Sequence, residues 1–575
     1  MISEKRWTLK IADEAKVNVL QQALSIHPML CKLLVARGIE TFEQAKAFFR
    51  PELTQLHDPF LMRDMDKAIQ RITQAIVKDE RILIYGDYDV DGTTSVATVY
   101  SFLKDIYPHI DYYIPNRYLE GYGISTQGID FAERNNFSLI IALDCGIKSV
   151  DKIEYANNKK IDFVICDHHL PGTELPQAIA VLDPKRNDCD YPYKELSGCG
   201  IGFKLIQAFA IQQGIDLQKV YRYLDLVCVS IGSDIVPITG ENRILAFHGL
   251  HKLNTQPCEG IKSLIELAGI KKAMTISDVV FTLGPRINAA GRIDDAKHAV
   301  KVLIAETESL QTDNNASVLQ KLNLERKDLD KNITEHALDM IATEERLQNK
   351  KSTVLFHETW HKGVIGIVAS RLIETYYRPT IVLTEYDGKV TGSARSVKGF
   401  DLYEAIYECK DLLIQFGGHK YAAGLTMLPE NVTAFTEKFE QVVTARITEE
   451  QLIPEIEIDA EISLEDITPK FFNILQQMAP FGPENMLPIF ITKNVKDSGW
   501  SKVLKEEHIK FSLRKGMREM QDGIGFRMAE KFPIVKNGNF DICYQIEENE
   551  WNEKVTLQLM VKDIRVNSPY LGKPK

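Results

Sequence analysis

Apolar and polar residues follow different periods along this chain, and the periods divide it into regions. Residues 1–75 carry apolar side chains at helical spacing, as in VNVLQQALSIHPMLCKLL, and end in the proline-containing RPELTQLHDPF. From residue 81 onward, apolar strand patterns (RILIYG, SLIIALDCG, IDFVICDHHL) alternate with amphipathic helical patterns. This alternation predicts a parallel sheet covered on both faces. We therefore expect a helical N-terminal region over 1–75 and an α/β domain over 76–304.

The second half of the chain changes pattern three times. Residues 305–350 are strongly charged, keep apolar residues at helical spacing and lack Pro and Gly, which predicts one long helix joining two domains. A new βαβ pattern (STVLFH, KGVIGIVASRL, PTIVLT) predicts a smaller α/β domain over 351–449. Beyond it, short alternating segments such as LPIFITKNV and HIKFSLRKG predict a small antiparallel barrel over 450–566.

Composition narrows the class of protein. The 575 residues are 44% hydrophobic and 26% charged, with a net charge of −11. The nine cysteines form no C-x-x-C pair, no apolar run is long enough to span a bilayer, and the first residues lack the apolar core of a signal peptide. We expect a cytoplasmic protein with reduced thiols and no membrane partner. Its acidity means that a nucleic acid would be held by a local groove of Arg and Lys or by metals.

Acidic residues and histidines gather where the predicted strands end. The carboxyl ends of parallel strands meet at one edge of a sheet, where α/β proteins place ligands. Alternate side chains of an extended segment also point the same way, so three aspartates after the first strand should face one spot. The residues concerned are Asp87, Asp89 and Asp91 after the first strand, Asp144 after the second, Asp167, His168 and His169 after the third, and Asp234 after an apolar helical run.

Two explanations compete for these residues. A single aspartate at such a place is more often a turn former or a helix cap. The whole set favours a metal centre, because carboxylates with one imidazole are ligands of Mn²⁺ or Mg²⁺. A carboxylate shared by two ions is the arrangement that supports in-line phosphoryl displacement. These residues therefore predict a metal centre for Mn²⁺ or Mg²⁺.

The same segments resemble a known family. GDYDVDGTTS, LDCG, CDHHL and GSDIVP together are similar to the four metal motifs of the DHH phosphoesterase superfamily. GPRINAAGRI, WHKGVIGIVASRL, GSARS, FGGHKYAAGLTM and APFGPENMLPIF narrow the resemblance to the RecJ single-strand-specific exonucleases, over nearly the whole chain. One position departs from the pattern, because Tyr85 stands where many DHH proteins have a histidine. Either Asp87 replaces that ligand, or one ion is held more loosely.

The resemblance implies an α/β fold: a parallel-sheet DHH domain, a long helix, a smaller DHHA1-type domain and an OB-fold β-barrel. It also implies the roles of the metal-binding residues. Asp91, Asp144, His168 and Asp234 would hold one ion. Asp89 and Asp144, with Asp87 nearby, would hold the other. His169 would orient a ligand or a bound phosphate, and Asp167 would accept a hydrogen bond from a histidine.

Candidate substrate-binding residues lie in the other motifs. Ser393 and Arg395 end a predicted strand, and a guanidinium with a hydroxyl suits a terminal phosphate, although a surface arginine is the simpler alternative. Glycines of the 360–372 motif permit close backbone approach, for packing or for an anion at a helix end. Tyr118 and Tyr122 are either stacking faces or core residues. The full set implied by the resemblance is Arg117, Arg286, Asn288 and Arg292 (the last three in an expected short loop), with Ser393, Arg395 and His419.

The expected function is that of a 5′→3′ exonuclease on single-stranded DNA, which releases 5′-mononucleotides by metal-assisted hydrolysis in DNA repair and recombination. By resemblance, a single-strand-binding protein and a repair helicase are its expected protein partners. One alternative is a DHH phosphodiesterase on short oligonucleotides or cyclic dinucleotides, which would not need the barrel after 450. Another alternative is a non-enzymatic binding module on a DHH fold. The acidic ligands are all retained, which argues against this alternative, because buried carboxylates are costly without metal.

Overall fold

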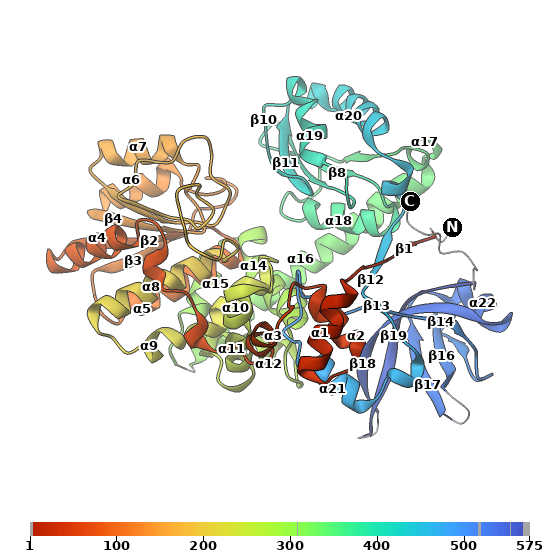
Figure 1. Cartoon of the computed structure of the whole chain (residues 1–575). Helices are drawn as coiled ribbons and strands as arrows, with labels where there is room; N and C mark the ends of the chain where they lie inside the picture. The colour runs from red at the N-terminus through yellow and green to blue at the C-terminus, as the bar shows by residue number, and fades with distance from the viewer. Residues whose placement is uncertain (1–3, 308, 516–518, 552–553, 567–575) are drawn as a thin grey trace. The chain divides into compact units, whose positions relative to one another are not determined.

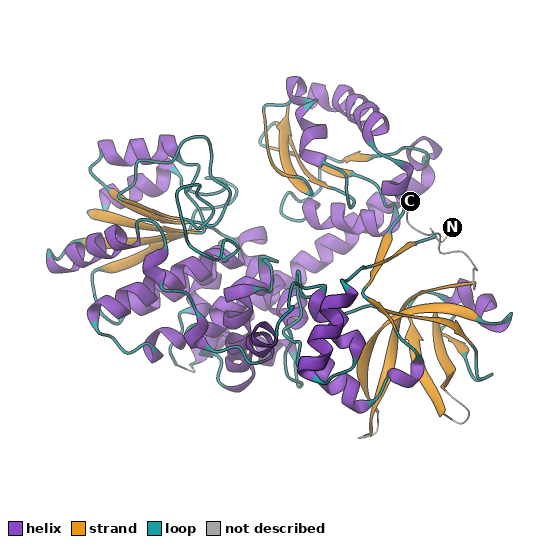
Figure 2. Cartoon of the chain, viewed as in Figure 1, coloured by secondary structure: helices purple, strands orange, loops and turns teal. Residues whose placement is uncertain are grey.

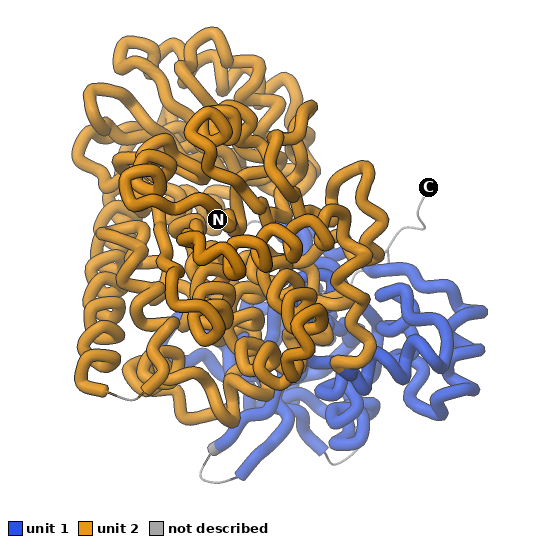
Figure 3. Tube along the Cα trace, turned by 90° about the vertical axis from the view of Figure 1, so that its left-hand side faces the viewer, with its two compact units in different colours: residues 1–52, 454–575 blue, residues 53–453 orange. Residues whose placement is uncertain are grey.

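The computed structural model describes residues 4–307, 309–515, 519–551 and 554–566. The chain divides into two compact units, which Figure 3 shows in different colours. The larger unit consists of residues 53–453, and the smaller one combines residues 1–52 with residues 454–575. The smaller unit is therefore built from both ends of the chain.

The larger unit begins with a five-stranded sheet in the order β3-β2-β4-β5-β6, and every neighbouring pair in it is parallel. This confirms the predicted parallel sheet. The strands are β2 (Arg81–Gly86), β3 (Ile110–Tyr113), β4 (Phe137–Leu143), β5 (Asp162–Cys166) and β6 (Ala180–Leu182). The carboxyl ends of β2, β4 and β5 lead directly into Asp87, Asp144 and Asp167.

Helices cover both faces of this sheet, because successive strand residues are apolar and point to opposite sides. Ile82 and Ile84 belong to the core on one face, and Leu83 and Tyr85 to the core on the other. Figure 2 shows the sheet between these helical layers. The first face is covered by α4 (Met65–Val77), α5 (Val90–Lys104) and α8 (Gly198–Gln213), and the second by α6 (Thr126–Arg134) and α7 (Val150–Asn158).

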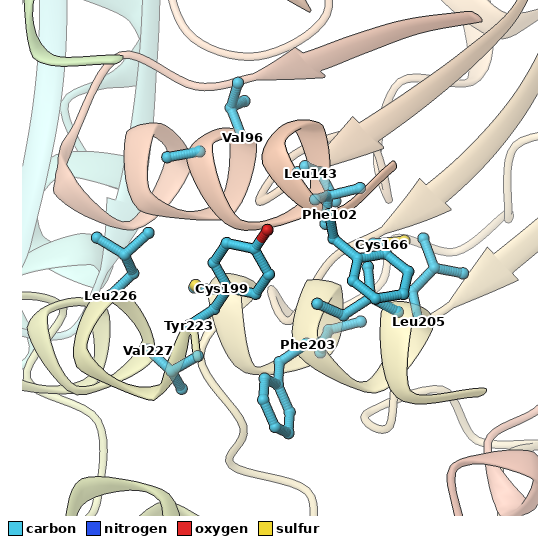
Figure 4. Packing of buried hydrophobic residues seen from close by; sticks show 14 of the residues in the cluster. Val96, Phe102, Leu143, Cys166, Cys199, Phe203, Leu205, Tyr223, Leu226 and Val227 are labelled. Atoms are coloured by element: carbon cyan, nitrogen blue, oxygen red, sulfur yellow. The ribbon is translucent and has the colours of Figure 1, made fainter. Parts of the chain in front are cut away.

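The first core continues into a helical layer that carries part of the site. Figure 4 shows Val96 and Phe102 of α5 packed near Phe203 of α8 and Leu226 of α10. The additional helices are α9 (Gln218–Tyr221), α10 (Leu224–Ser233), α11 (Gly240–Thr255), α12 (Glu259–Ala268), α13 (Ile276–Asp278), α14 (Gly284–Ile293) and α15 (Lys297–Leu303). A π-helical turn, Val279–Leu283, joins α13 to α14.

The prediction of a short loop at GPRINAAGR is wrong, because these residues form the helix α14. Pro285 sits in the first turn, where its missing N–H costs no hydrogen bond. Ala289 and Ala290 are buried in the core, and α14 packs along α16 (Leu310–Thr343). The local Gly and Pro signals indicated a loop, but packing against a distant helix decides the conformation. The helix α16 itself is the predicted long connecting helix.

A second sheet follows α16 in the order β10-β11-β9-β8-β7, where only β7 and β8 are parallel. The predicted βαβ unit is present, with α18 (Ile365–Thr375) between the parallel strands. The strands are β7 (Thr353–Phe356), β8 (Thr380–Tyr386), β9 (Lys389–Arg395), β10 (Gln415–His419) and β11 (Ala422–Met427). The other helices are α17 (Glu345–Gln348), α19 (Leu402–Tyr407) and α20 (Val432–Arg446), and Figure 1 shows α19 and α20 beside the sheet.

The smaller unit contains the predicted barrel, but two of its strand pairs, β13 with β14 and β17 with β19, are parallel, so the expectation of an antiparallel barrel is only partly right. Its sheet has the order β13-β14-β18-β19-β17-β16-β15, and the amide of Arg514 donates to the carbonyl of Lys496, which joins the segment after β14 to β16 and closes the sheet. The strands are β13 (Ala460–Glu461), β14 (Phe490–Val495), β15 (Lys502–Leu504), β16 (His508–Lys515), β17 (Glu519–Gly525), β18 (Phe540–Trp551) and β19 (Lys554–Val566). Helices α21 (Pro469–Gln476) and α22 (Phe532–Lys536) accompany them.

The N-terminal residues divide between the two units. Strand β1 (Arg6–Leu9) pairs with β12 (Glu455–Ile458), and Leu30, Leu33 and Leu34 share a core with the barrel. Residues 53–75, including most of α4, belong to the larger unit. The helices of this region are α1 (Glu14–Leu24), α2 (Pro28–Val35) and α3 (Phe42–Phe49). The helical spacing at the N-terminus therefore reflects an apolar face that the barrel covers.

Candidate metal centre and phosphate cavity

The three aspartates after β2 come together, but not along an extended segment as the sequence suggested. Strand β2 ends at Gly86, Asp89 caps α5 by accepting a hydrogen bond from the amide of Gly92, and Asp91 lies in the first turn of that helix. A Cβ on Gly92 would collide with the carbonyl of Asp87. The turn is therefore tight enough to bring all three carboxylates to the sheet edge.

The carboxylate of Asp91 is fixed by the start of α8 and by α10. It accepts hydrogen bonds from the amides of Gly198 at 2.7 Å and Cys199 at 2.8 Å, and from the hydroxyl of Ser230 at 2.6 Å. Its oxygen Oδ2 lies 3.6 Å from Nε2 of His168. Amides at a helix N-terminus are good donors to a carboxylate, so these three hydrogen bonds fix the orientation of the Asp91 side chain.

His168 lies at the centre of the acidic group. Its Nε2 atom is 3.2 Å from Oδ1 of Asp144 and 3.5 Å from Oδ2 of Asp234, which ends α10. Asp144 adopts a φ of +60°, a conformation that L-residues rarely take, and a Cβ on Gly198 would come within 2.7 Å of its Cβ. The backbone is thus shaped to bring Asp144 to the imidazole.

The carboxylates of this group repel one another. Burial raises the pKa of Asp144 well above its usual value, and the carboxylates of Asp91, Asp89, Asp234 and Asp87 raise it further. Burial followed by a neighbouring carboxylate also raises the pKa of Asp87 and of Asp234. Asp144 is therefore the carboxylate on which the charges of the other four act together.

The polar atoms of this group fit divalent cations. Among the described residues, Oδ2 of Asp87, Oδ1 of Asp144 and both ring nitrogens of His168 are buried without a hydrogen-bond partner. Burial lowers the pKa of His168, which favours the neutral imidazole that ligates metals. Buried polar atoms in native proteins are nearly always satisfied, and oxygen-rich sets with one imidazole suit Mn²⁺ or Mg²⁺.

His169 makes a separate contact beside this group. Its Nδ1 atom is 2.7 Å from Oδ1 of Asp167, which also accepts the amide of His168 at 2.8 Å. Burial lowers the pKa of His169, but the hydrogen bond and charge of Asp167 outweigh it and leave the pKa at about 9. The hydroxyl of Tyr122 lies 3.2 Å from Nε2 of His169. Asp167 therefore orients a cationic imidazole at the edge of the acidic group.

Tyr85, which replaces a histidine of the family pattern, is a core residue. Its side chain is fully buried, its hydroxyl donates to the carbonyl of Gly123 at 2.9 Å, and its ring stacks on Tyr113. It faces the α6 side of the sheet with Leu83. Asp87, rather than Tyr85, supplies the additional polar atom near Asp89.

A cationic cavity of about 510 Å³ adjoins the acidic group. Its charged lining consists of Arg117, Arg292, Lys362 and Arg395, and the described residues that line it include no carboxylate. The guanidinium of Arg395 donates to the hydroxyl of Ser393 at 3.1 Å, and Arg117 lies over the ring of Tyr88, 5.1 Å from its centroid. Burial and the charges of Arg117 and Arg395 lower the pKa of Arg292 to about 10. Cations gathered in this way suit an anion such as a phosphate.

Glycines make room for this cavity at the start of α18. A Cβ on Gly366 would lie 2.8 Å from Oγ of Ser393 and 2.9 Å from Nη2 of Arg395. A Cβ on Gly363 would collide with the carbonyl of Arg292, which also accepts the hydroxyl of Tyr118. The positive end of α18 therefore faces the cavity at close range, as anion sites at helix N-termini require.

The other predicted substrate residues take different positions. Asn288 lines a second cavity together with Arg292. Arg286 instead fastens α14 to its surroundings, because it donates to Gln320 at 2.8 Å and to the carbonyl of Thr282 at 2.7 Å. His419 is exposed at the end of β10 and lines neither cavity.

Sequence reasoning missed some residues of the site. Lys362 lies inside the motif WHKG but was not singled out, and it stands 4.4 Å from the ring centroid of Tyr386. Tyr88 lies between two aspartates and supports Arg117. Of the two tyrosines with open roles, Tyr118 packs against His361 and Tyr386, and Tyr122 is 55% exposed. Only the position of Tyr88 within the acidic segment offered a signal.

Comparisons with known proteins agree with this arrangement. The DHH family N-terminal domain matches residues 81–231, the DHHA1 domain matches 349–445, and the RecJ OB domain matches 458–563. The single-stranded-DNA-specific exonuclease RecJ of Bacillus subtilis is 37% identical over 572 residues, which cover 99% of this chain and 72% of that protein. The chain belongs to the RecJ family. RecJ of Escherichia coli is 31% identical and covers 93% of this chain and 96% of that protein.

Solved RecJ structures share the fold. RecJ of Thermus thermophilus in complex with Mn²⁺ has a TM-score of 0.84 and 25% identity, and the match covers 99% of this chain and 80% of that one. Another RecJ, bound to manganese, has a TM-score of 0.60 and 28% identity over 69% of this chain and 98% of that one. The DHH, DHHA1 and OB parts that the sequence resemblance implied are therefore those of RecJ.

Among the described residues, no helix is long and apolar enough to span a membrane.

Proposed function

We propose that this protein is a metal-dependent 5′→3′ exonuclease specific for single-stranded DNA that releases 5′-mononucleotides. The observation that carries the proposal is the juxtaposition of two sites. A buried carboxylate group with unsatisfied oxygens lies next to a cavity whose charged lining is entirely cationic. Membership of the RecJ family supplies the substrate class, since the curated relatives are single-stranded-DNA-specific exonucleases.

The metal ligands are assigned by motif and by position. Asp91, Asp144, His168 and Asp234 would hold one Mn²⁺ or Mg²⁺ ion, and Asp89, Asp144 and Asp87 the other. Asp144 is assigned to both because the family motif gives it this role, and its buried Oδ1 atom has no hydrogen-bond partner. The chemistry that two such ions supply when bound is activation of water and stabilisation of the attacking and leaving oxygens of an in-line displacement.

His169 takes a different role in this scheme. Its imidazole is held by Asp167 and has a pKa of about 9, so it is charged at neutral pH. We assign it to a non-bridging oxygen of the scissile phosphate, where a positioned cation favours the charge that develops. Because Asp167 fixes Nδ1, this contact falls to the Nε2 side of the ring, where the phosphate oxygen would share or replace the contact with the hydroxyl of Tyr122.

The cationic cavity explains a preference for one strand end. Two metal ions alone do not distinguish the 5′ from the 3′ direction. Ser393 and Arg395 would bind a terminal 5′-phosphate, with Arg117, Lys362 and Arg292 adding charge. A terminal phosphate held there would place the first phosphodiester at the carboxylates beside Tyr88. The polarity of the enzyme thus resides in the second α/β domain.

The alternatives receive less support. A phosphodiesterase for cyclic dinucleotides would leave the RecJ OB domain at 458–563 without a role. A binding module without activity would have no need for the unsatisfied oxygens of Asp87 and Asp144. A role in DNA repair and recombination, a cytoplasmic location, and a single-strand-binding protein and a repair helicase as partners follow from the family resemblance.

A nuclease assay tests the proposal. Single strands of graded length, labelled at the 5′ or the 3′ end, are incubated with Mn²⁺ or Mg²⁺ beside blunt duplex of the same sequence. We expect 5′-mononucleotides from the first time point, no cleavage of the duplex, and no reaction after chelation. Release of 3′-terminal nucleotides first, or cleavage restricted to dinucleotides, would contradict it.

A further inference from the structure

We propose that a second cavity of the larger unit receives the nucleotides that follow the scissile bond, and that Phe281 is a stacking face for one of their bases. This inference rests on the proposed function and deepens it. It concerns how the enzyme binds the nucleotides beyond the scissile bond. Neither the metal ligands nor the terminal phosphate cavity determines this binding.

The second cavity also borders the metal-ligand segments. It has a volume of about 810 Å³ and is lined by Val90 and Ser233, the neighbours of Asp89, Asp91 and Asp234 in the sequence. The phosphate cavity is lined instead by Tyr88, and Arg292 lines both. The two cavities therefore flank the same acidic segment and share one cation. On this proposal, a strand whose 5′ end occupies the first cavity passes the carboxylates and enters the second.

Phe281 presents an aromatic ring to the second cavity. It is 76% exposed, whereas Val279 and Leu283 of the same π-helical turn are fully buried in the core. Single π-helical turns inside helices are frequent at functional sites. Phe281 is thus not a core residue. An exposed aromatic ring beside cations is the combination that binds single-stranded nucleic acid without sequence preference.

The charges of the cavity favour a polyanion. Arg326 and Lys327 of α16 line it beside Arg292. Asp330 is engaged mainly by Arg371 of α18, through Nη2 at 2.8 Å and Nε at 2.9 Å, and its Oδ2 lies 3.7 Å from Nη1 of Arg326, so it offsets only part of this positive charge. Glu335 and Glu374 also line the cavity. Burial lowers the pKa of Lys327, and the charges of Arg286 and Arg326 lower it further.

Substitution of Phe281 combined with an abasic-site scan tests the proposal. Phe281→Ala removes the ring, Phe281→Tyr keeps a stacking face, and Phe247→Ala is the matched control, since Phe247 on α11 is 37% exposed and lines neither cavity. Each enzyme is assayed with Mn²⁺ on a 5′-phosphorylated 12-mer, on copies with one abasic site at successive positions, and on a 5′-phosphorylated dinucleotide.

We expect Phe281→Ala to lower kcat/KM on the 12-mer by about five- to a hundredfold, mainly through KM, and to leave the dinucleotide unaffected. In the wild type, one abasic position beyond the scissile bond should cause a similar loss, and Phe281→Ala should be insensitive to it. Phe281→Tyr and Phe247→Ala should behave like the wild type.

Two results would overturn the proposal. Equal losses on 12-mer and dinucleotide would place Phe281 in the support of the metal centre. In the second result, each abasic site would lower kcat/KM of Phe281→Ala by the same factor as it lowers that of the wild type. The two losses would then be independent at every position, which would show that no base stacks on this ring. Failure of the proposed function is distinguishable, because the wild type would then release no 5′-mononucleotide from either substrate.

Discussion

Asp144 combines two unfavourable features in one residue, a left-handed backbone and a buried charge among other carboxylates. A non-glycine residue in this conformation costs on the order of 1 kcal/mol or more. Such costs persist where function requires the geometry. Asp144 could be located from sequence because ligand-binding residues lie at the carboxyl ends of parallel strands, and the alternating pattern predicted such a sheet. Sequence position alone could not supply the backbone angle, nor the close packing of the Asp144 side chain against Gly198 of a distant helix.

Asp144→Asn should reduce hydrolysis about a thousandfold, equivalent to ~4 kcal/mol of transition-state stabilisation, and leave binding of single strands intact. The amide keeps the shape but cannot supply the charge that two ions share. Rates are measured with Mn²⁺ and binding by fluorescence anisotropy, with the exposed Asp151→Asn as a control for net charge. Substantial residual turnover by Asp144→Asn would contradict its assignment to both ions.

Arg395→Ala should weaken cleavage of 5′-phosphorylated strands far more than of 5′-hydroxyl strands. Loss of a charge-assisted contact costs roughly 1.5–3 kcal/mol, which is about ten- to a hundredfold in kcat/KM. The same oligonucleotide is assayed with each 5′ group, by wild type and variant. Equal losses on both substrates would show that Arg395 does not contact the terminal phosphate.

At the scale of elements, α18 sets the geometry of the phosphate cavity. The sequence predicted this helix and its small residues correctly, but left open whether its glycines serve helix packing or an anion site. The structure places Gly366 against Ser393 and Arg395, and Gly363 against the carbonyl of Arg292. That pairing joins segments far apart in the chain. The prediction of a loop at α14 failed for the same reason. Its helix is stabilised by packing on α16, where Gln320 accepts a hydrogen bond from Arg286, 34 residues earlier in the chain.

Gly366→Ala should act like a partial loss of Arg395. The added Cβ would lie 2.9 Å from Nη2 of Arg395, so the guanidinium must move. We expect the preference for a 5′-phosphate to fall severalfold, with little change on 5′-hydroxyl strands. Gly172→Ala is the control, because the nearest atom to its Cβ is 3.7 Å away. An unchanged phosphate preference in Gly366→Ala, at wild-type melting temperature, would refute this role.

At the scale of the molecule, the metal centre and both cavities belong to residues 53–453. The barrel belongs to a separate unit with residues 1–52. The sequence predicted the barrel from its alternating strands, but gave no local signal that the N-terminal helices cover it. Such pairing depends on β1 meeting β12, about 450 residues later.

A fragment of residues 53–453 should fold and cleave a 5′-phosphorylated dinucleotide at a rate close to that of the full chain. Its affinity for long strands should fall by about tenfold or more, because the stacking and backbone contacts of the barrel are absent. Circular dichroism establishes folding, and product lengths over time establish processivity. A folded fragment without activity would assign a catalytic contribution to the barrel.

The pairing of residues 1–52 with the last segment of the chain also affects synthesis. At 5–20 residues per second, about 400 intervening residues separate the two partners by roughly 20 to 80 s of translation. Throughout that interval Leu30, Leu33 and Leu34 have no barrel to cover them. Chains that terminate before residue 454 never acquire one. We therefore expect truncated products to be recognised by chaperones and proteases through their N-terminal helices, even where residues 53–453 have folded.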